Sequence, residues 1–251
     1  EIGVRLVGSE MCIRDRDGLI SVMRHGFKHR GINFRVCYFK PESELNELAN
    51  EHYKQNVCQC IRQWHYTEAN RNSIDMMLAV NGIPVVAIEL KNQLTGQSVD
   101  DAMRQWEYNR NPKEYAFGFN KRVLAYFACD LYNIYMTTQL NGAETVFLPF
   151  NQGSNGAGKD GGAGNPTTED GKYVTSYFWE NVLQKDKLLD ILQKFISYER
   201  SEKKKIMPDG STKTTVSSKV IFPRYHQLDV VRELVSHVRE NGAGHNYLIQ
   251  H

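Results

Sequence analysis

The sequence predicts an α/β domain, because strand, strand, helix and strand signals follow one another in its central part. Residues 71–93 hold two apolar runs around an Asn-Gly pair, which is typical of a β-hairpin. Ser98 and Asp101 have the spacing of a capping box that starts a helix. Residues 122–129 form an apolar run of strand length. The predicted helix carries one apolar stripe, made of Val99, Ala102, Met103 and Trp106.

The flanking segments extend this pattern on both sides. Residues 42–53 have a helical apolar spacing, and residues 131–150 predict a further hairpin around a second Asn-Gly pair. Residues 151–172 are rich in Gly and Asn and lack the Gly-Lys-Ser/Thr ending of a phosphate-binding loop, so they predict a surface loop. Residues 176–199 predict a core helix, with a stripe of Leu188, Leu189, Ile191, Leu192, Phe195 and Ile196.

We predict two domains joined by a linker. The first domain spans residues 17–199. The lysine run at residues 201–205 breaks the apolar pattern and predicts a linker or exposed loop over residues 200–219. Residues 220–251 supply a strand, a helix with Pro223 near its start, and a final apolar strand, NYLIQH. The chain is therefore expected to stop inside a second domain.

The first residues of the chain are unusual. Residues 1–16 contain VGSEMCIRDR, which resembles translated sequencing-adapter read-through more than natural protein sequence. We predict a non-native leader there and exclude it from the predicted fold.

The composition excludes several classes of protein. Hydrophobic residues make up 41% and charged residues 24%, as in soluble globular proteins, and no apolar run is long enough to cross a membrane. The net charge of +2 does not by itself indicate a polyanionic partner. Five cysteines without a CxxC pair predict neither a disulfide framework nor a zinc site, and this composition favours a cytoplasmic location. Neither HExxH nor Gly-x-Ser-x-Gly is present, so zinc-peptidase and serine-hydrolase chemistry have no support.

Three charged side chains interrupt the predicted hairpin. Asp75 lies in its first strand, and Glu89 and Lys91 lie at the end of its second. A charged side chain at the end of an apolar strand costs free energy unless an interaction or a function compensates for it. Glu89 and Lys91 are two residues apart, so on a strand both side chains leave the same face. Whether Asp75 joins them depends on the register, because a shift by one residue moves a side chain to the opposite face.

Pro84 favours the register that brings the acids together. A two-residue Asn-Gly turn would place them on opposite faces. Because Pro84 cannot donate a ladder hydrogen bond, we expect pairing to begin beyond it, with Ala79 opposite Val85. Asp75 then lies opposite Glu89.

Such a group of side chains suits metal-assisted phosphate chemistry. Two adjacent carboxylates repel unless a cation lies between them, and Mg²⁺ accepts such ligands together with waters and substrate phosphates. Lys91 beside them can stabilise charge that develops on a phosphate or help to activate a water. Glycoside cleavage also uses two carboxylates, but it has no use for the lysine. A simple ion pair between Lys91 and one of the acids at a sheet edge is the structural alternative.

Asp75, followed by the string IELKN and by a helix that carries Gln105, resembles the motif of the PD-(D/E)xK nucleases. The resemblance implies that Asp75 and Glu89 bind Mg²⁺ and that Lys91 is the catalytic lysine. It also implies a metal contact from the backbone carbonyl of Ile88 and a catalytic role for Gln105.

Two longer stretches, residues 85–110 and 176–199, resemble the amino-terminal region of the restriction (R) subunit of type I restriction-modification enzymes. The resemblance covers most of residues 50–251. It implies a mixed sheet flanked by helices, followed by the first elements of a RecA-like helicase domain. Residues 17–199 would form the nuclease domain, which cuts double-stranded DNA. The implied partners are the methyltransferase (M) and specificity (S) subunits.

The resemblance is incomplete at two places. The family often has a tyrosine four residues after the glutamine, whereas Asn109 stands there and Tyr108 lies one residue short, so the role of Tyr108 is open. Some nucleases of this class add an acid on an N-terminal helix, for which Glu44, Glu47 and Glu51 are candidates.

The end of the chain resembles the start of an ATP-driven motor. IFPRYHQ, residues 221–227, resembles the segment with which superfamily 2 motors read adenine, with Gln227 as the candidate residue. NYLIQH resembles the strand that leads into the phosphate-binding loop, and that loop is not part of this sequence. ATP is therefore expected to be a cofactor of the full-length protein only.

The alternative function is a non-cutting structural or DNA-docking module that positions partner subunits. The presence of Asp75, Glu89 and Lys91 favours the nuclease.

Overall fold

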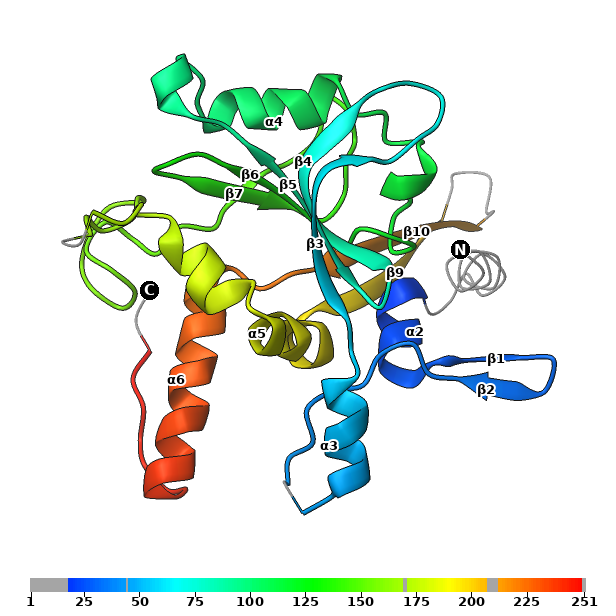
Figure 1. Cartoon of the computed structure of the whole chain (residues 1–251), viewed down its shortest axis with the longest axis vertical. Helices are drawn as coiled ribbons and strands as arrows, with labels where there is room; N and C mark the ends of the chain where they lie inside the picture. Colours follow the sequence, from blue (N-terminus) through cyan, green and yellow to red (C-terminus); the bar gives the residue numbers. More distant parts are fainter. Residues whose placement is uncertain (1–17, 44, 169–170, 207–211, 250–251) are drawn as a thin grey trace.

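The computed structural model describes residues 18–43, 45–168, 171–206 and 212–249, so the predicted leader lies outside the described residues. A mixed sheet with the strand order β3-β4-β5-β6-β7-β8 crosses the molecule (Figure 1). β5 and β6 run parallel, and the other neighbours are antiparallel. The predicted α/β class is therefore confirmed. The strands are β3 (Cys58–His65), β4 (Ser73–Val80), β5 (Ile83–Leu90), β6 (Ala125–Cys129), β7 (Ile134–Thr137) and β8 (Leu148–Pro149).

Helix α4 (Val99–Tyr108) connects β5 to β6 and covers one face of the sheet (Figure 1). It begins as predicted, because the backbone N–H of Ser98 donates to the carboxylate of Asp101 at 2.9 Å. The predicted stripe faces the sheet, with Val99, Ala102 and Trp106 buried and Met103 packed against them. The short helix η1 (Gln93–Thr95) precedes α4, and η2 (Tyr115–Phe117) follows it.

The other face of the sheet packs on the larger hydrophobic core, which includes side chains of α2 (Gly18–His25), α5 (Lys185–Asp190) and the start of α6 (Tyr225–Asn241). The predicted stripe lies in this core as expected, with Phe195 at its margin. The helix itself is shorter than predicted, because π-helical turns η3 (Phe178–Val182) and η4 (Ile191–Phe195) flank α5 and a strand follows at once.

The predicted linker is wrong in its local structure. Most of it lies in an antiparallel ribbon of β9 (Ser197–Ile206) and β10 (Thr212–Ile221). Thr and Val favour extended backbone in β10, and pairing with β9 satisfies the backbone groups of both strands. The predicted strand NYLIQH is also wrong where it is described, because residues 246–249 adopt no regular structure. The domain boundaries and a RecA-like domain stay predictions.

Smaller elements complete the fold. β7 and β8 pair as the predicted second hairpin, across a ten-residue loop at residues 138–147. Helix α3 (Glu47–Lys54) confirms the helical apolar spacing of residues 42–53 over its own length. Residues 151–168 form the predicted loop. β1 (Phe27–His29) and β2 (Ile32–Phe34) form a separate hairpin. Among the described residues, no helix combines the length and apolar character that crossing a bilayer requires.

The β4–β5 hairpin begins with a turn that the register prediction had set aside. Asn81 and Gly82 form a two-residue turn with φ values of 50° and 79°, and Val80 pairs with Ile83 beside it. Asn-Gly suits such a turn because both central residues adopt positive φ. Pro84 therefore lies inside the ladder, and the predicted start of pairing beyond it is wrong.

A β-bulge in β5 then restores the predicted face. Ala79 pairs with Pro84, but its neighbour Leu78 pairs with Val86, so Val85 is an extra residue on β5. The predicted pair of Ala79 and Val85 does not form. Because one extra residue exchanges the two faces of the strand, the outer half of the hairpin nevertheless has the predicted register.

Candidate active site

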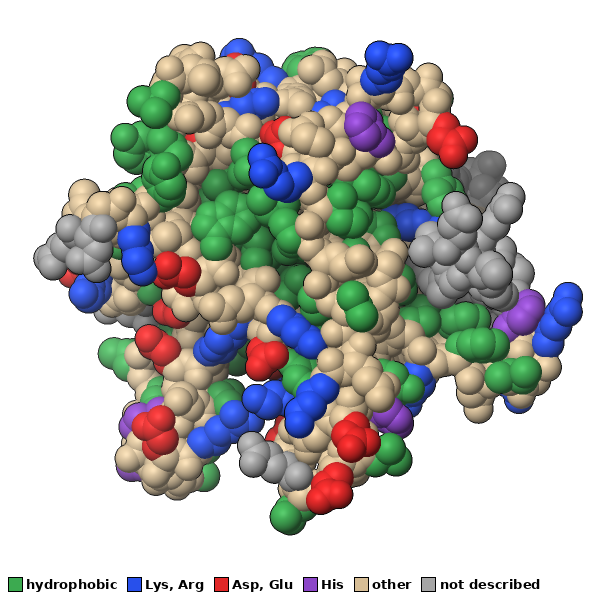
Figure 2. Space-filling model, viewed as in Figure 1, with side chains coloured by type: hydrophobic (Ala, Val, Ile, Leu, Met, Phe, Trp, Pro, Cys, Tyr) green, Lys and Arg blue, Asp and Glu red, His purple; other side chains and the backbone are tan. Residues whose placement is uncertain are grey.

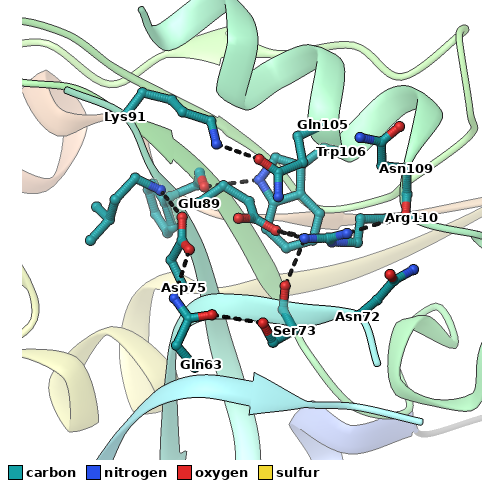
Figure 3. A network of polar contacts seen from close by, with 12 residues as sticks. Gln63, Asn72, Ser73, Asp75, Glu89, Lys91, Gln105, Trp106, Asn109 and Arg110 are labelled. Atoms are coloured by element: carbon teal, nitrogen blue, oxygen red, sulfur yellow. Dashed lines mark hydrogen bonds and ion pairs between the residues drawn. The ribbon is translucent and has the colours of Figure 1, made fainter. Parts of the chain in front are cut away.

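Asp75 and Glu89 lie side by side where β4 and β5 separate (Figure 3). The paired part of the hairpin ends with Met76 opposite Ile88, and the next residues outward are Asp75 and Glu89. The two acids predicted to share a face therefore do so. The β-bulge in β5 is the cause, because regular pairing outward from the Asn81-Gly82 turn would put Asp75 opposite Ile88 and the two acids on opposite faces.

Asp75 is held by one hydrogen bond on each carboxylate oxygen. Gln63 Nε2 donates to Oδ1 at 3.0 Å, and the backbone N–H of Leu90 donates to Oδ2 at 2.8 Å. These donors come from the strands on either side of β4, so the carboxylate is fixed relative to both. Each oxygen has a second lone pair, which can bind a further partner.

Glu89 is fully buried and is paired with Arg110, which follows α4. Arg110 Nε and one terminal nitrogen both donate to Oε1, at 2.9 and 2.6 Å. Oε2 is buried and accepts no hydrogen bond from a donor group of the described residues, while the carboxylate of Asp75 lies within interacting distance of the Glu89 carboxyl. A buried carboxylate oxygen without a partner is uncommon and needs an explanation, such as an ion that the site accommodates.

Opposing effects set the pKa of Glu89. Burial raises this pKa, the positive charge of Arg110 lowers it, and the negative charge of Asp75 raises it further, so the resulting pKa is about 8. A cation beside the carboxyl group of Glu89 would favour its ionised form.

Lys91 follows β5 directly, and α4 holds its side chain. Its backbone N–H donates to the carbonyl of Cys129 at 2.9 Å, and its ammonium group donates to the side-chain oxygen of Gln105. The buried indole of Trp106, next to Gln105, donates to the carbonyl of Phe127 at 3.0 Å and thereby fastens α4 to β6. The structure thus places the side chain of Gln105 against that of Lys91, as the catalytic roles expected for these two residues require (Figure 3).

Ile88 is poorly placed for the predicted metal contact. It is 0% exposed and pairs with Met76 on one side and Phe127 on the other. Leu90 is better placed, because its N–H bonds Asp75 and the carbonyl of the same residue leaves an extended strand on the same side. The ladder to β4 has ended at this point, so no ladder hydrogen bond to β4 occupies that carbonyl.

Other predicted contributors lie away from the acids. Tyr108 is 68% exposed, and Asn109 ends α4 at the surface. Glu44 lies outside the described residues. Glu47 and Glu51 belong to α3, which leads into the end of β3 beside the hairpin turn. A strand of this length puts them roughly 20 Å from the acids.

Arg110 and Gln63 contact the acids but were not among the predicted site residues. Arg110 stands five residues after Gln105, and Gln63 lies in the strand before Asp75. Neither position follows a motif, because each acquires its role through tertiary contact. The only local signal was a charged residue two positions after the end of the helix that carries Gln105.

Gln227 lies in the first turn of α6, far along the chain from the acids. Its side-chain oxygen accepts a hydrogen bond from the backbone N–H of Arg224 at 3.0 Å, which caps the helix. A cavity of about 570 Å³ opens beside it, between the β7–β8 loop, the end of β10 and α6. Neither Asp75 nor Glu89 lines this cavity.

Positive charge is spread over the surface. On the face drawn in Figure 2, Lys and Arg side chains gather around the hollow between α6 and α3 and are also scattered near α4. This distribution agrees with the small net charge of +2.

A mixed sheet flanked by helices, with two acids and a lysine at neighbouring strand ends, is consistent with the class of PD-(D/E)xK-like nucleases. Residues 33–154 match the family described as type I restriction enzyme R protein N terminus. This region of the chain is therefore similar to that family, as the resemblance of its sequence implied. No curated protein matches the chain.

Proposed function

We propose that this chain is a Mg²⁺-dependent endonuclease domain that hydrolyses phosphodiester bonds of double-stranded DNA. The observation that carries the proposal is the convergence of Asp75, Glu89 and Lys91 at one end of the sheet, where the buried Oε2 of Glu89 has no donor within the described part of the chain. The match of residues 33–154 to the R protein family supports it.

The donor set fits Mg²⁺. Within the described ranges, no group of three or more His, Cys, Asp or Glu side chains is placed to hold a metal. Mg²⁺ needs fewer, because it is usually bound by one or two carboxylates together with waters and substrate phosphate. Asp75, Glu89 and the carbonyl of Leu90 would hold the ion, which supplies an activated water and charge stabilisation at the phosphate.

Lys91 and Gln105 would act on the substrate side of the acids. An ammonium group in this place can stabilise the charge that develops on the phosphate oxygens during hydrolysis. The side-chain oxygen of Gln105 accepts a hydrogen bond from the ammonium group of Lys91 and so orients the other two N–H bonds of that group. This pairing argues against the structural alternative for Lys91, because its ammonium bonds a neutral amide rather than an acid.

The non-cutting module is the second candidate. Its support is the ion pair of Glu89 and Arg110, which resembles a structural contact. Such a pair would usually satisfy both carboxylate oxygens through the two-pronged geometry of arginine. The unpartnered Oε2 therefore favours the nuclease.

Plasmid nicking in Mg²⁺ tests the proposal. We expect wild type to nick supercoiled DNA, Lys91→Ala to lose this activity, and Lys172→Ala, an exposed lysine paired with Glu180, to keep it. Mn²⁺ binding by calorimetry provides a readout without turnover, which Glu89→Ala should abolish. Nicking that is unchanged in Lys91→Ala would refute the assignment.

The whole-protein properties are also proposals that rest on the family. They are assembly with M and S subunits in the cytoplasm, and ATP-driven translocation by the full-length R protein. Gln227 beside its cavity is the proposed adenine contact, through the amide nitrogen that helix capping does not use.

A further inference from the structure

A continuous chain of hydrogen bonds joins the two acids around the outside of the site (Figure 3). Gln63 donates to Asp75 at 3.0 Å and accepts from the hydroxyl of Ser73 at 2.7 Å. The carbonyl of Ser73 accepts from Arg110 at 2.7 Å, and Arg110 donates to Glu89. Ser73 lies two residues before Asp75 on β4 and uses both its side chain and its backbone.

Gln63 makes its contacts from a strained backbone. Its φ is +48°, although it lies inside β3 between the pairs Arg62–Met76 and Trp64–Ile74. A residue with a side chain adopts this conformation at a cost and keeps it only where the surroundings fix it. Here the hydrogen bonds of its side chain with Asp75 and Ser73 hold Gln63 in this conformation.

The contact of Arg110 with Ser73 also explains why Arg110 donates to only one carboxylate oxygen of Glu89. The nitrogen that donates to Ser73 also donates to Oε1 of Glu89, so the guanidinium lies to one side of the carboxylate. The ring of Tyr66, 5.8 Å away, supports it there. Oε2 consequently receives no hydrogen bond from Arg110 or from any other donor that the structure describes, and it lies on the side of Asp75 (Figure 3).

We propose that Gln63, Ser73 and Arg110 are positioning residues, which hold the carboxylates of Asp75 and Glu89 in the arrangement that binds one divalent ion. The inference rests on the proposed function and adds to it the residues that preorganise the metal ligands. Residues that orient metal ligands typically affect metal affinity about tenfold to a hundredfold.

Glycine substitution at two positions of β3 separates positioning from folding. Gln63→Gly removes the side chain and also relieves the strain, so we expect an unchanged or higher thermal midpoint with Mn²⁺ affinity about tenfold to a hundredfold lower. Gln59→Gly is the matched control, because Gln59 is exposed and regularly paired with Ala79. It should lower the midpoint and leave Mn²⁺ affinity unchanged.

A second pair of variants tests Arg110. Arg110→Lys keeps the positive charge but loses the geometry that reaches Ser73 and Glu89 together, so Mn²⁺ affinity should fall in the same range. Arg104→Lys on the exposed side of α4 is the control and should bind as wild type does. In nicking assays, Gln63→Gly should require more Mg²⁺ for half-maximal rate and regain most of the wild-type rate at saturating Mg²⁺.

The outcomes separate this inference from the proposed function. Mn²⁺ binding by wild type that Glu89→Ala abolishes supports the nuclease. If Gln63→Gly and Arg110→Lys then bind Mn²⁺ as tightly as wild type, the positioning role is refuted and the nuclease stands. If wild type binds no Mn²⁺, both fail together.

Discussion

The ammonium group of Lys91 donates a hydrogen bond to the side-chain oxygen of Gln105, so the residue that follows β5 is fastened to α4. A free lysine side chain has many rotamers and would spend much of its time away from the acids. The contact therefore decides where positive charge stands relative to Asp75 and Glu89.

Gln105→Ala should slow DNA nicking about tenfold to a hundredfold, because a catalytic group that is displaced by about 1 Å loses this much rate. Mn²⁺ affinity should not change, since the acids keep their partners. Single-turnover rates at saturating Mg²⁺ measure the effect. A loss of Mn²⁺ binding in this variant would place Gln105 among the metal-binding groups instead.

Above pH 8, where Glu89 is ionised, Arg110→Met should destabilise the protein by about 3–5 kcal/mol, because it leaves the buried charge of Glu89 unpaired. The double variant Arg110→Met, Glu89→Gln should recover part of this loss, since no buried charge remains. Urea unfolding of both variants and of Glu89→Gln measures the coupling. Additive effects would show that the two side chains do not interact.

The metal-free protein should lose stability as pH rises from about 4.5 to about 8. Burial raises the pKa of Glu89 from 4.5 to about 8, so in this window the folded state holds a proton that the unfolded state releases. The stabilisation is fully present below pH 4.5 and is lost as pH rises through 8. Urea midpoints measured across this range should show the decline.

Glu89→Gln provides the control for this pH dependence. Gln does not titrate, so the contribution of this site to the slope should vanish. Mn²⁺ binding to wild type should tighten from pH 6 to pH 8, because the ion competes with the proton on Glu89. A metal affinity that is independent of pH would contradict the assignment of Glu89 as a ligand.

Trp106→Phe should lower the free energy of unfolding by about 1–3 kcal/mol, because the buried carbonyl of Phe127 loses its donor. Trp179→Phe at a partly buried position is the control and should cost less. Thermal unfolding followed by circular dichroism measures both. Equal effects would mean that the hydrogen bond of Trp106 contributes little.

Local signals in the sequence predicted most of the fold near the site. The capping box at Ser98 and the stripe that ends at Trp106 specify α4 within a few residues, so no distant contact was needed. The acids were placed on one face correctly, but for a wrong reason. Pro84 was expected to stay outside the ladder, whereas an extra residue beyond it sets the register.

The rest of the site depends on contacts between distant segments. Arg110 reaches Glu89 across 21 positions of sequence, and Gln63 reaches Asp75 only because β3 pairs with β4. Pattern reading has no access to either contact. The ribbon of β9 and β10 does not follow from the sequence pattern, because its lysine run predicts a linker or loop, whereas lysines are also common in edge strands.

The bulge in β5 selects one of two possible registers for the outer half of the β4–β5 hairpin. If Val85 paired regularly with Leu78 and no bulge formed, Asp75 would instead meet Ile88 across the strands, and the two acids would lie on opposite faces. A one-residue slip of this register would thus separate the acids while every proposed ligand stays in the sequence. Surveys of relatives that score only the presence of acids and lysine would count such a chain as competent.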